Sequence, residues 1–268
     1  MKKVFTLLIY VFAIIGFVLV AVFTAVHLGW TNSPGIIDQQ HDYFQNTSAT
    51  TTTWSQGEEW AVLREAIGKD TEVINVVSKK VNISPRTLVS ILIVEQLRLF
   101  NSNREIFKSV FAPLKILGNQ SQFSWGVMGI KQETARQIEA NLIDKQSSWY
   151  PGKEFESFLI YPATTTEAER DSERFARLTN EDDRMYSYLY AALLVKQLEA
   201  QWEKSKFPIT DKPGIIATLY NIGFKNSNPN ADPHVGGAEI EIGDTTYSFG
   251  GLAESFYYSS EMIEEFPK

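Results

Sequence analysis

The chain has 268 residues, a net charge of −7 at neutral pH and no cysteine. A hydrophobic content of 44% is enough to form a packed core. The lack of cysteine excludes disulfides, cysteine-bound zinc and thiol nucleophiles. An acidic chain without clustered Lys and Arg is also a poor partner for nucleic acid, whose phosphates need such clusters.

The N-terminal segment predicts a membrane anchor. Lys2 and Lys3 precede a run over residues 4–28 without Asp, Glu, Lys or Arg. About 20 apolar residues cross a bilayer core, whereas the apolar region of a cleaved signal peptide has only about 7–15. Residues 25–27 (Ala-Val-His) also form a poor cleavage site. We therefore expect residues 1–30 to form one uncleaved transmembrane helix, rather than a cleaved signal peptide or a buried helix of a soluble core.

The charges that flank this helix predict its orientation. After Lys3 the next basic residue is Arg64. The acidic residues between them are Asp38, Asp42, Glu58 and Glu59. The positive-inside bias then places the N-terminus in the cytoplasm and the rest of the chain on the other side of the membrane.

A tether and one domain are expected after the anchor. Residues 31–53 are polar or small and lack periodicity, with Asn-Ser-Pro-Gly at 32–35, so we expect a flexible tether. From Trp54 to Lys268 the pattern is mostly helical. The predicted helices span 57–68, 71–81, 85–100, 102–109, 131–143, 166–178, 182–204, 212–222 and 252–264.

Local signals support some of these elements. Ser84 suits the N-cap and Pro85 the first position of the helix at 85–100. Asp182 and Asp183 are expected in the first turn of the helix at 182–204, where the helix dipole favours acids. The alternation at 238–249, with a Gly-Asp turn inside it, predicts a β-hairpin. The sequence therefore predicts a mainly α domain with one small β element.

Glu95 is the candidate catalytic residue. It lies near the end of the helix at 85–100, on a face that we expect to turn toward the core. The apolar residues on that face are Leu88, Ile91, Leu92 and Leu99. A partly desolvated carboxyl retains its proton more readily, and a protonated carboxyl can act as general acid on a glycosidic oxygen. The alternative is a structural glutamate that pairs with Arg98 or reaches out to water.

Two later segments resemble motifs of one family. The segment 124–135 reads Ser-Trp-Gly-Val-Met-Gly-Ile-Lys-Gln-Glu-Thr-Ala. It resembles the Ser-x-x-Gly-Leu-Met-Gln-Ile-x-x-x-Thr-Ala stretch of lytic transglycosylases and goose-type lysozymes. The segment 217–223, Ala-Thr-Leu-Tyr-Asn-Ile-Gly, is similar to the Ala-Tyr-Asn-Ala-Gly motif of the same superfamily. The segment 188–194 looks like the helix that leads to this motif, so the resemblance covers 84–225 in the family's order.

The resemblance implies a helical, lysozyme-like fold with a groove for the glycan strands of peptidoglycan. Glu95 matches the single acid and base that cleaves the β-1,4 bond between N-acetylmuramic acid and N-acetylglucosamine and yields a 1,6-anhydro product. The sugar's N-acetyl group assists, so neither a second carboxylate nor a cofactor is implied. The residues that match the substrate-binding surface are Ser124, Gly126, Val127, Met128, Tyr220 and Asn221.

One alternative is a hydrolysing lysozyme. Goose-type hydrolases are expected to carry aspartates soon after the catalytic Glu. No Asp lies between Glu95 and Asp144, which favours a transglycosylase. The histidines do not have the spacing of zinc ligands, so we expect no metal.

A second alternative is a non-catalytic relative that binds peptidoglycan or acts as a scaffold. Gln96 stands where the family often has Ser, and Gly129 where it has Gln; both differences favour this alternative. An enzyme requires the carboxyl of Glu95 to open into a groove within reach of Tyr220. A Glu95 that is sealed in the core or held by Arg98 would contradict the enzyme and favour the non-catalytic relative.

Overall fold

The structure is a computed structural model that describes residues 16–17, 53–101, 124–162 and 164–268. The chain separates into two compact units, Met1–Gln39 and Gln40–Lys268, and the elements below belong to the second. The predicted anchor at 1–30, tether at 31–53 and helix at 102–109 lie outside the described residues, apart from Gly16, Phe17 and Thr53. Within the described ranges, no helix is both long enough and apolar enough to span a bilayer.

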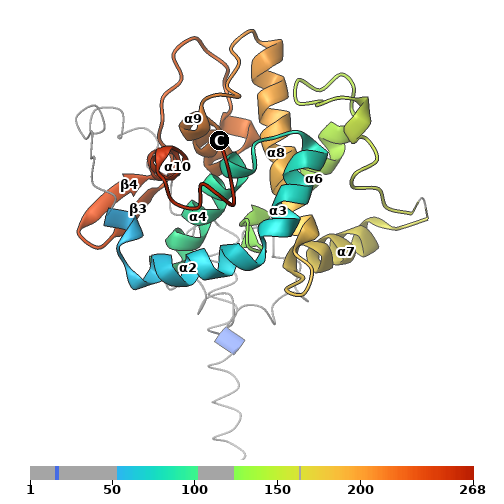
Figure 1. Ribbon diagram of the computed structural model, residues 1–268. Coiled ribbons are helices and arrows are strands. Elements are labelled where there is room, and N and C mark those ends of the chain that lie inside the picture. The colour runs from blue at the N-terminus through green and yellow to red at the C-terminus, as the bar shows by residue number, and fades with distance from the viewer. Residues whose placement is uncertain (1–15, 18–52, 102–123, 163) are drawn as a thin grey trace, which may run out of the picture. The chain divides into compact units, whose positions relative to one another are not determined.

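The larger unit is mainly helical, which confirms the predicted mainly α class (Figure 1). Its α-helices are α2 (Glu58–Lys69), α3 (Thr71–Val81), α4 (Pro85–Asn101), α6 (Gln132–Ile143), α7 (Glu167–Thr179), α8 (Met185–Lys204), α9 (Pro213–Ile222) and α10 (Phe249–Tyr258). Short 3-10 helices span Thr53–Ser55, Lys153–Phe155 and Phe224–Asn226. At the start of α4, the amide of Thr87 donates to the hydroxyl of Ser84 at 3.4 Å, as expected for the predicted N-cap.

The described ranges also contain two antiparallel hairpins. Strands β3 (Glu239–Ile242) and β4 (Thr245–Ser248) form the predicted hairpin, with Gly243 at φ +58° in its turn. Strands β1 (Ser124–Trp125) and β2 (Ile130–Lys131) form a second, shorter hairpin. The sequence did not predict this pair, because two residues are too few to show an alternating pattern.

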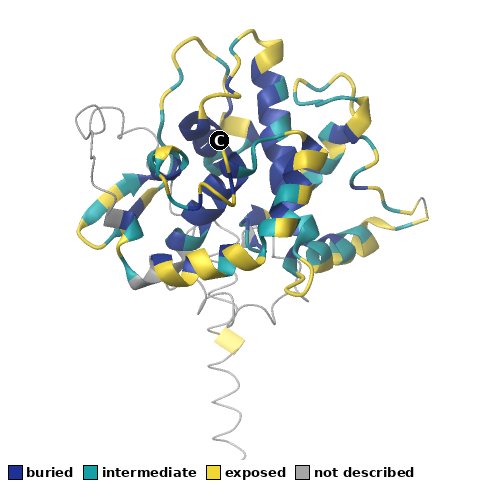
Figure 2. Cartoon of the chain, in the orientation of Figure 1, coloured by how far each residue is buried: buried dark blue, intermediate teal, exposed yellow. Residues whose placement is uncertain are grey.

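Helix α4 is central and is buried on every side (Figure 2). Residues 86–95 are all buried, and the helix packs against α2, α3, α9, α10 and β3. The prediction of a single core-facing side is therefore too narrow. Between Leu88 and Glu95 the only polar residue is Ser90, and its hydroxyl donates to the carbonyl of Arg86 at 2.7 Å, so no side of this stretch has to face water.

Helix α8 begins later than predicted. The side-chain oxygen of Asn180 accepts hydrogen bonds from the amides of Asp182 and Asp183, at 3.0 and 3.1 Å. The carboxylate of Asp183 then accepts from the amide of Met185 at 3.0 Å. These local bonds form turns that precede the helix, so the prediction that both aspartates lie in its first turn is wrong.

Helix α10 differs from the predicted 252–264 at both ends. It begins at Phe249, because the hydroxyl of Ser248 caps it by accepting from the amide of Gly251 at 3.1 Å. It ends at Tyr258, where the chain turns around the guanidinium of Arg86 in α4. Arg86 is fully buried and donates to the carbonyls of Phe256, Tyr257, Ser259, Glu261 and Phe266, at 2.7–3.0 Å.

Candidate active site

Glu95 lies in the C-terminal part of α4, and only 3% of its surface is exposed. It is buried because α4 is the central helix. A buried carboxylate needs a partner, and Arg98 lies one helical turn further along. Its Nη2 donates to Oε2 of Glu95 at 2.5 Å. This is the pairing that we considered for a structural glutamate.

The turn between β1 and β2 approaches this carboxylate. Gly126 and Gly129 both have a φ of +64°, and the amide of Gly129 donates to the carbonyl of Gly126 at 3.2 Å. A Cβ at Gly129 would lie 2.6 Å from Oε2 of Glu95, and one at Gly126 would lie 2.1 Å from the carbonyl oxygen of Leu178. Glycine is therefore required at both positions, for backbone conformation and for space.

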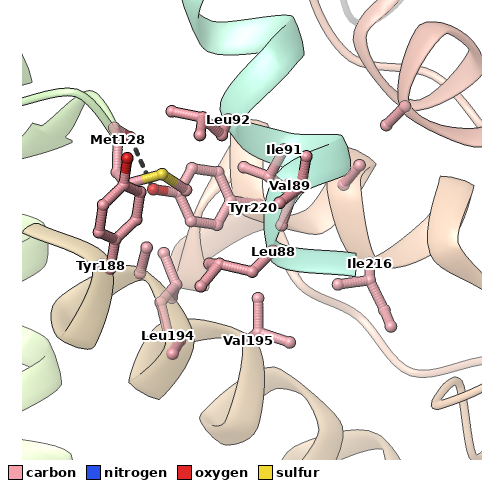
Figure 3. Close-up of a cluster of buried hydrophobic side chains, with 14 of the residues drawn as sticks. Leu88, Val89, Ile91, Leu92, Met128, Tyr188, Leu194, Val195, Ile216 and Tyr220 are labelled. Carbon is pink, nitrogen blue, oxygen red and sulfur yellow. Dashed lines mark hydrogen bonds between the residues drawn. The ribbon is translucent and has the colours of Figure 1, made fainter. Parts of the chain in front are cut away.

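Two side chains hold the turn in place. The hydroxyl of Tyr220, from α9, donates to the carbonyl of Met128 at 2.6 Å (Figure 3). The side-chain amide of Gln96, from α4, donates to the carbonyl of Val127 at 2.5 Å. Burial raises the pKa of Tyr220 well above its usual value, and the negative charge of Glu95 raises it further, so this hydroxyl remains a donor.

The predicted substrate-binding residues are divided between two places. Gly126, Val127 and Met128 form the turn beside Glu95, and Tyr220 supports it. Ser124 pairs with Lys131 in the hairpin that carries this turn. Asn221 does something else, because its side-chain oxygen accepts from the amide of Ala238 at 2.9 Å and so fixes the approach to β3.

Sequence reasoning missed the contact of Gln96. It was considered only as a departure from the family's Ser, yet its longer side chain reaches the carbonyl of Val127. The sequence offered no signal for this contact, since it depends on how the turn at 126–129 sits against α4.

The site meets only part of the expectation for an enzyme. Tyr220 bonds to the turn beside Glu95, and the charge of Glu95 raises the pKa of Tyr220. However, the side chain of Glu95 is only 4% exposed and is paired with Arg98, whose own side chain is 20% exposed. This burial and this pairing are the arrangement that we expected to contradict the enzyme and to favour a non-catalytic relative.

Glu133 lies in the first turn of α6, where the helix dipole favours a negative charge, and its carboxylate accepts from Gln137 at 3.3 Å. Within the described ranges, no group of three His, Asp or Glu side chains is placed to hold a metal ion. No family model, curated protein or solved structure matches this chain.

Proposed function

We propose that this protein is a peptidoglycan-cleaving enzyme of the lytic transglycosylase type, with Glu95 as its single catalytic acid and base. The observation that carries the proposal is the convergence of three distant segments on one carboxyl. Glu95 comes from α4, Gly129 from the β1–β2 turn, and Tyr220 from α9. The resemblance to lysozyme-like enzymes relies on the same three segments, and their meeting supports it.

The proposed reaction begins with a protonated Glu95. Its proton passes to the glycosidic oxygen between N-acetylmuramic acid and N-acetylglucosamine, and the bond from that oxygen to the anomeric carbon breaks. The neighbouring N-acetyl group supports the positive anomeric carbon. The carboxylate of Glu95 then accepts the proton of the sugar's 6-hydroxyl, and the oxygen of that hydroxyl bonds to the anomeric carbon. This step closes the 1,6-anhydro ring and returns Glu95 to its protonated form.

Arg98 adds a step to this mechanism. A guanidinium that bonds to a carboxylate favours its ionised form. Breaking the bond to Arg98 would therefore help Glu95 to hold the proton that the reaction needs. The backbone turn at 126–129 does not have to move for this, because Tyr220 and Gln96 hold it independently of Arg98.

A non-catalytic peptidoglycan-binding or scaffold protein is the second candidate. The burial of Glu95 and its bond to Arg98 favour it. In that case the turn, held by Tyr220, would remain as a binding surface, while Glu95 and Arg98 would form a structural ion pair.

One experiment separates these functions. The full chain and its Glu95→Gln variant are incubated with purified peptidoglycan, and the soluble products are identified by mass spectrometry. Release of 1,6-anhydro-muropeptides by the wild type alone is the expected result. Reducing-end products that depend on Glu95 would indicate a hydrolysing lysozyme. If neither protein releases products while both sediment with the polymer, the non-catalytic candidate replaces the enzyme.

The proposal also places the larger unit outside the cytoplasmic membrane, where peptidoglycan lies, with residues 1–30 as the anchor. The chain should then stay in the membrane fraction after alkaline carbonate extraction, and a variant without residues 1–30 should be soluble. Extraction of the full chain into the soluble fraction would contradict the anchor.

A further inference from the structure

Gln96 directly follows the proposed catalytic acid in α4, and its side chain bonds to the turn between β1 and β2. Its Nε2 donates to the carbonyl oxygen of Val127 at 2.5 Å. Consecutive residues of an α-helix point about 100° apart, so Glu95 and Gln96 lie on different sides of α4. The last residue of the same turn, Gly129, lies close to the carboxyl of Glu95, since a Cβ there would be 2.6 Å from Oε2. Two adjacent side chains of α4 therefore meet one turn.

The turn has little support from its own backbone. β1 and β2 pair over two residues each, and the amide of Gly129 donates to the carbonyl of Gly126 at 3.2 Å. Because an isolated hairpin is marginally stable at best, the helices around this one have to hold it in place. On α8, Ser187 lies beside Gly126, because a Cβ on that glycine would be 2.7 Å from the serine hydroxyl. On α9, Tyr220 donates to the carbonyl of Met128 at 2.6 Å.

Gln96 differs from these two neighbours because it belongs to the helix that carries the acid. The contacts of Ser187 and Tyr220 place the turn relative to α8 and α9, whereas the bond of Gln96 places it relative to α4. No other element lies between this bond and Glu95, since the two residues are consecutive. The bond of Gln96 therefore limits most directly how far the turn can shift against the carboxyl.

We propose that Gln96 is a positioning residue, which holds the turn at 126–129 in register with Glu95. This inference rests on the proposed function and adds a residue to it. The role needs both a long side chain and a hydrogen-bond donor. A serine would end closer to the helix backbone, and a methionine of similar length has no N–H to donate. The residue that departs from the family's Ser then has a role in holding the site.

Hydrogen–deuterium exchange of the full chain tests the bond without turnover. Gln96→Met and Gln96→Ser remove it in two different ways. Gln197→Met is the matched control, because Gln197 also donates from a helix to a backbone carbonyl, that of Ile138 in α6, at 2.9 Å. Mass spectrometry reads the exchange of peptides that contain residues 126–129, and thermal unfolding shows that each variant is folded.

Both changes at Gln96 should speed exchange in these peptides on the order of fivefold, the factor that corresponds to one hydrogen bond. Gln197→Met should leave exchange of the turn unchanged, because its lost bond joins α8 to α6.

The kinetics of cleavage test whether the position of the turn matters to the acid. Initial rates are measured over a range of concentrations of soluble glycan strands prepared from peptidoglycan. Gln96→Met and Gln96→Ser should each lower kcat about tenfold and leave KM within about twofold, because a misplaced acid weakens the transition state more than the bound substrate. Gln197→Met should keep both constants within about twofold of the wild type.

Three results would overturn the inference while the proposed function stands. The first is equal exchange of the turn in the wild type and in both Gln96 variants. The second is faster exchange with an unchanged kcat, which would show that the turn does not position the acid. The third is an equal loss of kcat in Gln197→Met, which would indicate general destabilisation. If the wild type itself cleaves nothing, the proposed function fails and the inference fails with it.

Discussion

The two ends of α4 each carry an arginine, and the two arginines differ in how completely they are bonded. Arg86, near the first turn, is fully buried and donates to five backbone carbonyls of the C-terminal segment. Arg98, near the last turn, bonds to one carboxylate oxygen and leaves its Nε without a partner in the described part of the chain. The same side chain is saturated at one end of the helix and incompletely bonded at the other.

The two arginines therefore differ in what their bonds contribute to stability. A saturated buried group stabilises one conformation, whereas a buried donor without a partner costs free energy and calls for an explanation. A second ion pair supports the distinction. Glu139 accepts from Arg174 through both oxygens and also from the hydroxyls of Tyr161 and Tyr190. That pair joins α6, α7 and α8. Like Arg86, and unlike Arg98 beside Glu95, it forms many hydrogen bonds with its neighbours.

The largest expected effect is on stability, at the saturated end of α4. Arg86→Met leaves several buried carbonyls without partners, so the free energy of unfolding should fall by at least about 3 kcal/mol. Arg64→Met is the matched control, because the side chain of Arg64 is 56% exposed and lies 4.0 Å from Glu261 of the same C-terminal segment. It should change stability by less than about 0.5 kcal/mol. Urea unfolding measures the free energy of unfolding of both variants. Equal losses would show that the hydrogen bonds of Arg86 stabilise the fold no more than an exposed arginine does.

The next effect concerns activity at the other end of the helix. Gly129→Ala puts a methyl group against the carboxylate of Glu95, and we expect cleavage to fall about a hundredfold, as for other small displacements of catalytic groups. Gly243→Ala carries a similar backbone strain, since its φ is +58°, but its methyl group would meet open space. It should keep full activity. Similar activities of the two variants would show that the turn does not position Glu95.

A smaller effect is expected for Tyr220→Phe. This change removes one hydrogen bond and leaves the carbonyl of Met128 buried, so the free energy of unfolding should fall by about 1–2 kcal/mol. Tyr258→Phe is the control, because Tyr258 is 57% exposed, and it should be neutral. Thermal unfolding of both variants checks the prediction. If Tyr220→Phe is also neutral, the turn is held by other contacts.

The smallest effect is a dependence of stability on pH, at a carboxylate away from both arginines. Burial raises the pKa of Glu199, so the folded state holds this proton more tightly than the unfolded state does. The stability that the protonated form contributes is lost as the pH rises from the ordinary range of Glu through the raised pKa. Glu199→Gln should therefore be more stable than the wild type at neutral pH, by less than about 1 kcal/mol, and this gain should shrink in acid.

Urea unfolding of the wild type and of Glu199→Gln, at about pH 4 and about pH 7, measures how this gain depends on pH. A gain for Glu199→Gln that grows as the pH falls would have the wrong sign.

The sequence predicted the elements better than the contacts at their ends. Periodicity located α4 and the β3–β4 hairpin, because both carry regular patterns of apolar residues. It misplaced the start of α8 and both ends of α10, because side-chain bonds from Asn180, Ser248 and Arg86 decide them. Such bonds depend on the tertiary neighbours, which a single sequence does not reveal.

The same limit applies to the candidate site. Motif order was enough to predict that Glu95, the turn at 126–129 and Tyr220 are neighbours, and the structure brings them together. It was not enough to show that Asn221 supports β3, that Gln96 binds the turn, or that Nε of Arg98 has no partner among the described residues. These facts depend on the distances between side chains and backbone that only the fold sets.

We propose that Glu95 is the catalytic acid and base, and not only the ion-pair partner of Arg98. The most direct test compares initial rates of peptidoglycan cleavage by the full chain for Glu95→Gln and for Glu133→Gln, a neutralised carboxylate on the exposed start of α6. We expect Glu95→Gln to lose at least about a hundredfold, the usual contribution of a general acid, while Glu133→Gln stays within about twofold of the wild type. A Glu95→Gln variant that cleaves as fast as Glu133→Gln would contradict the account.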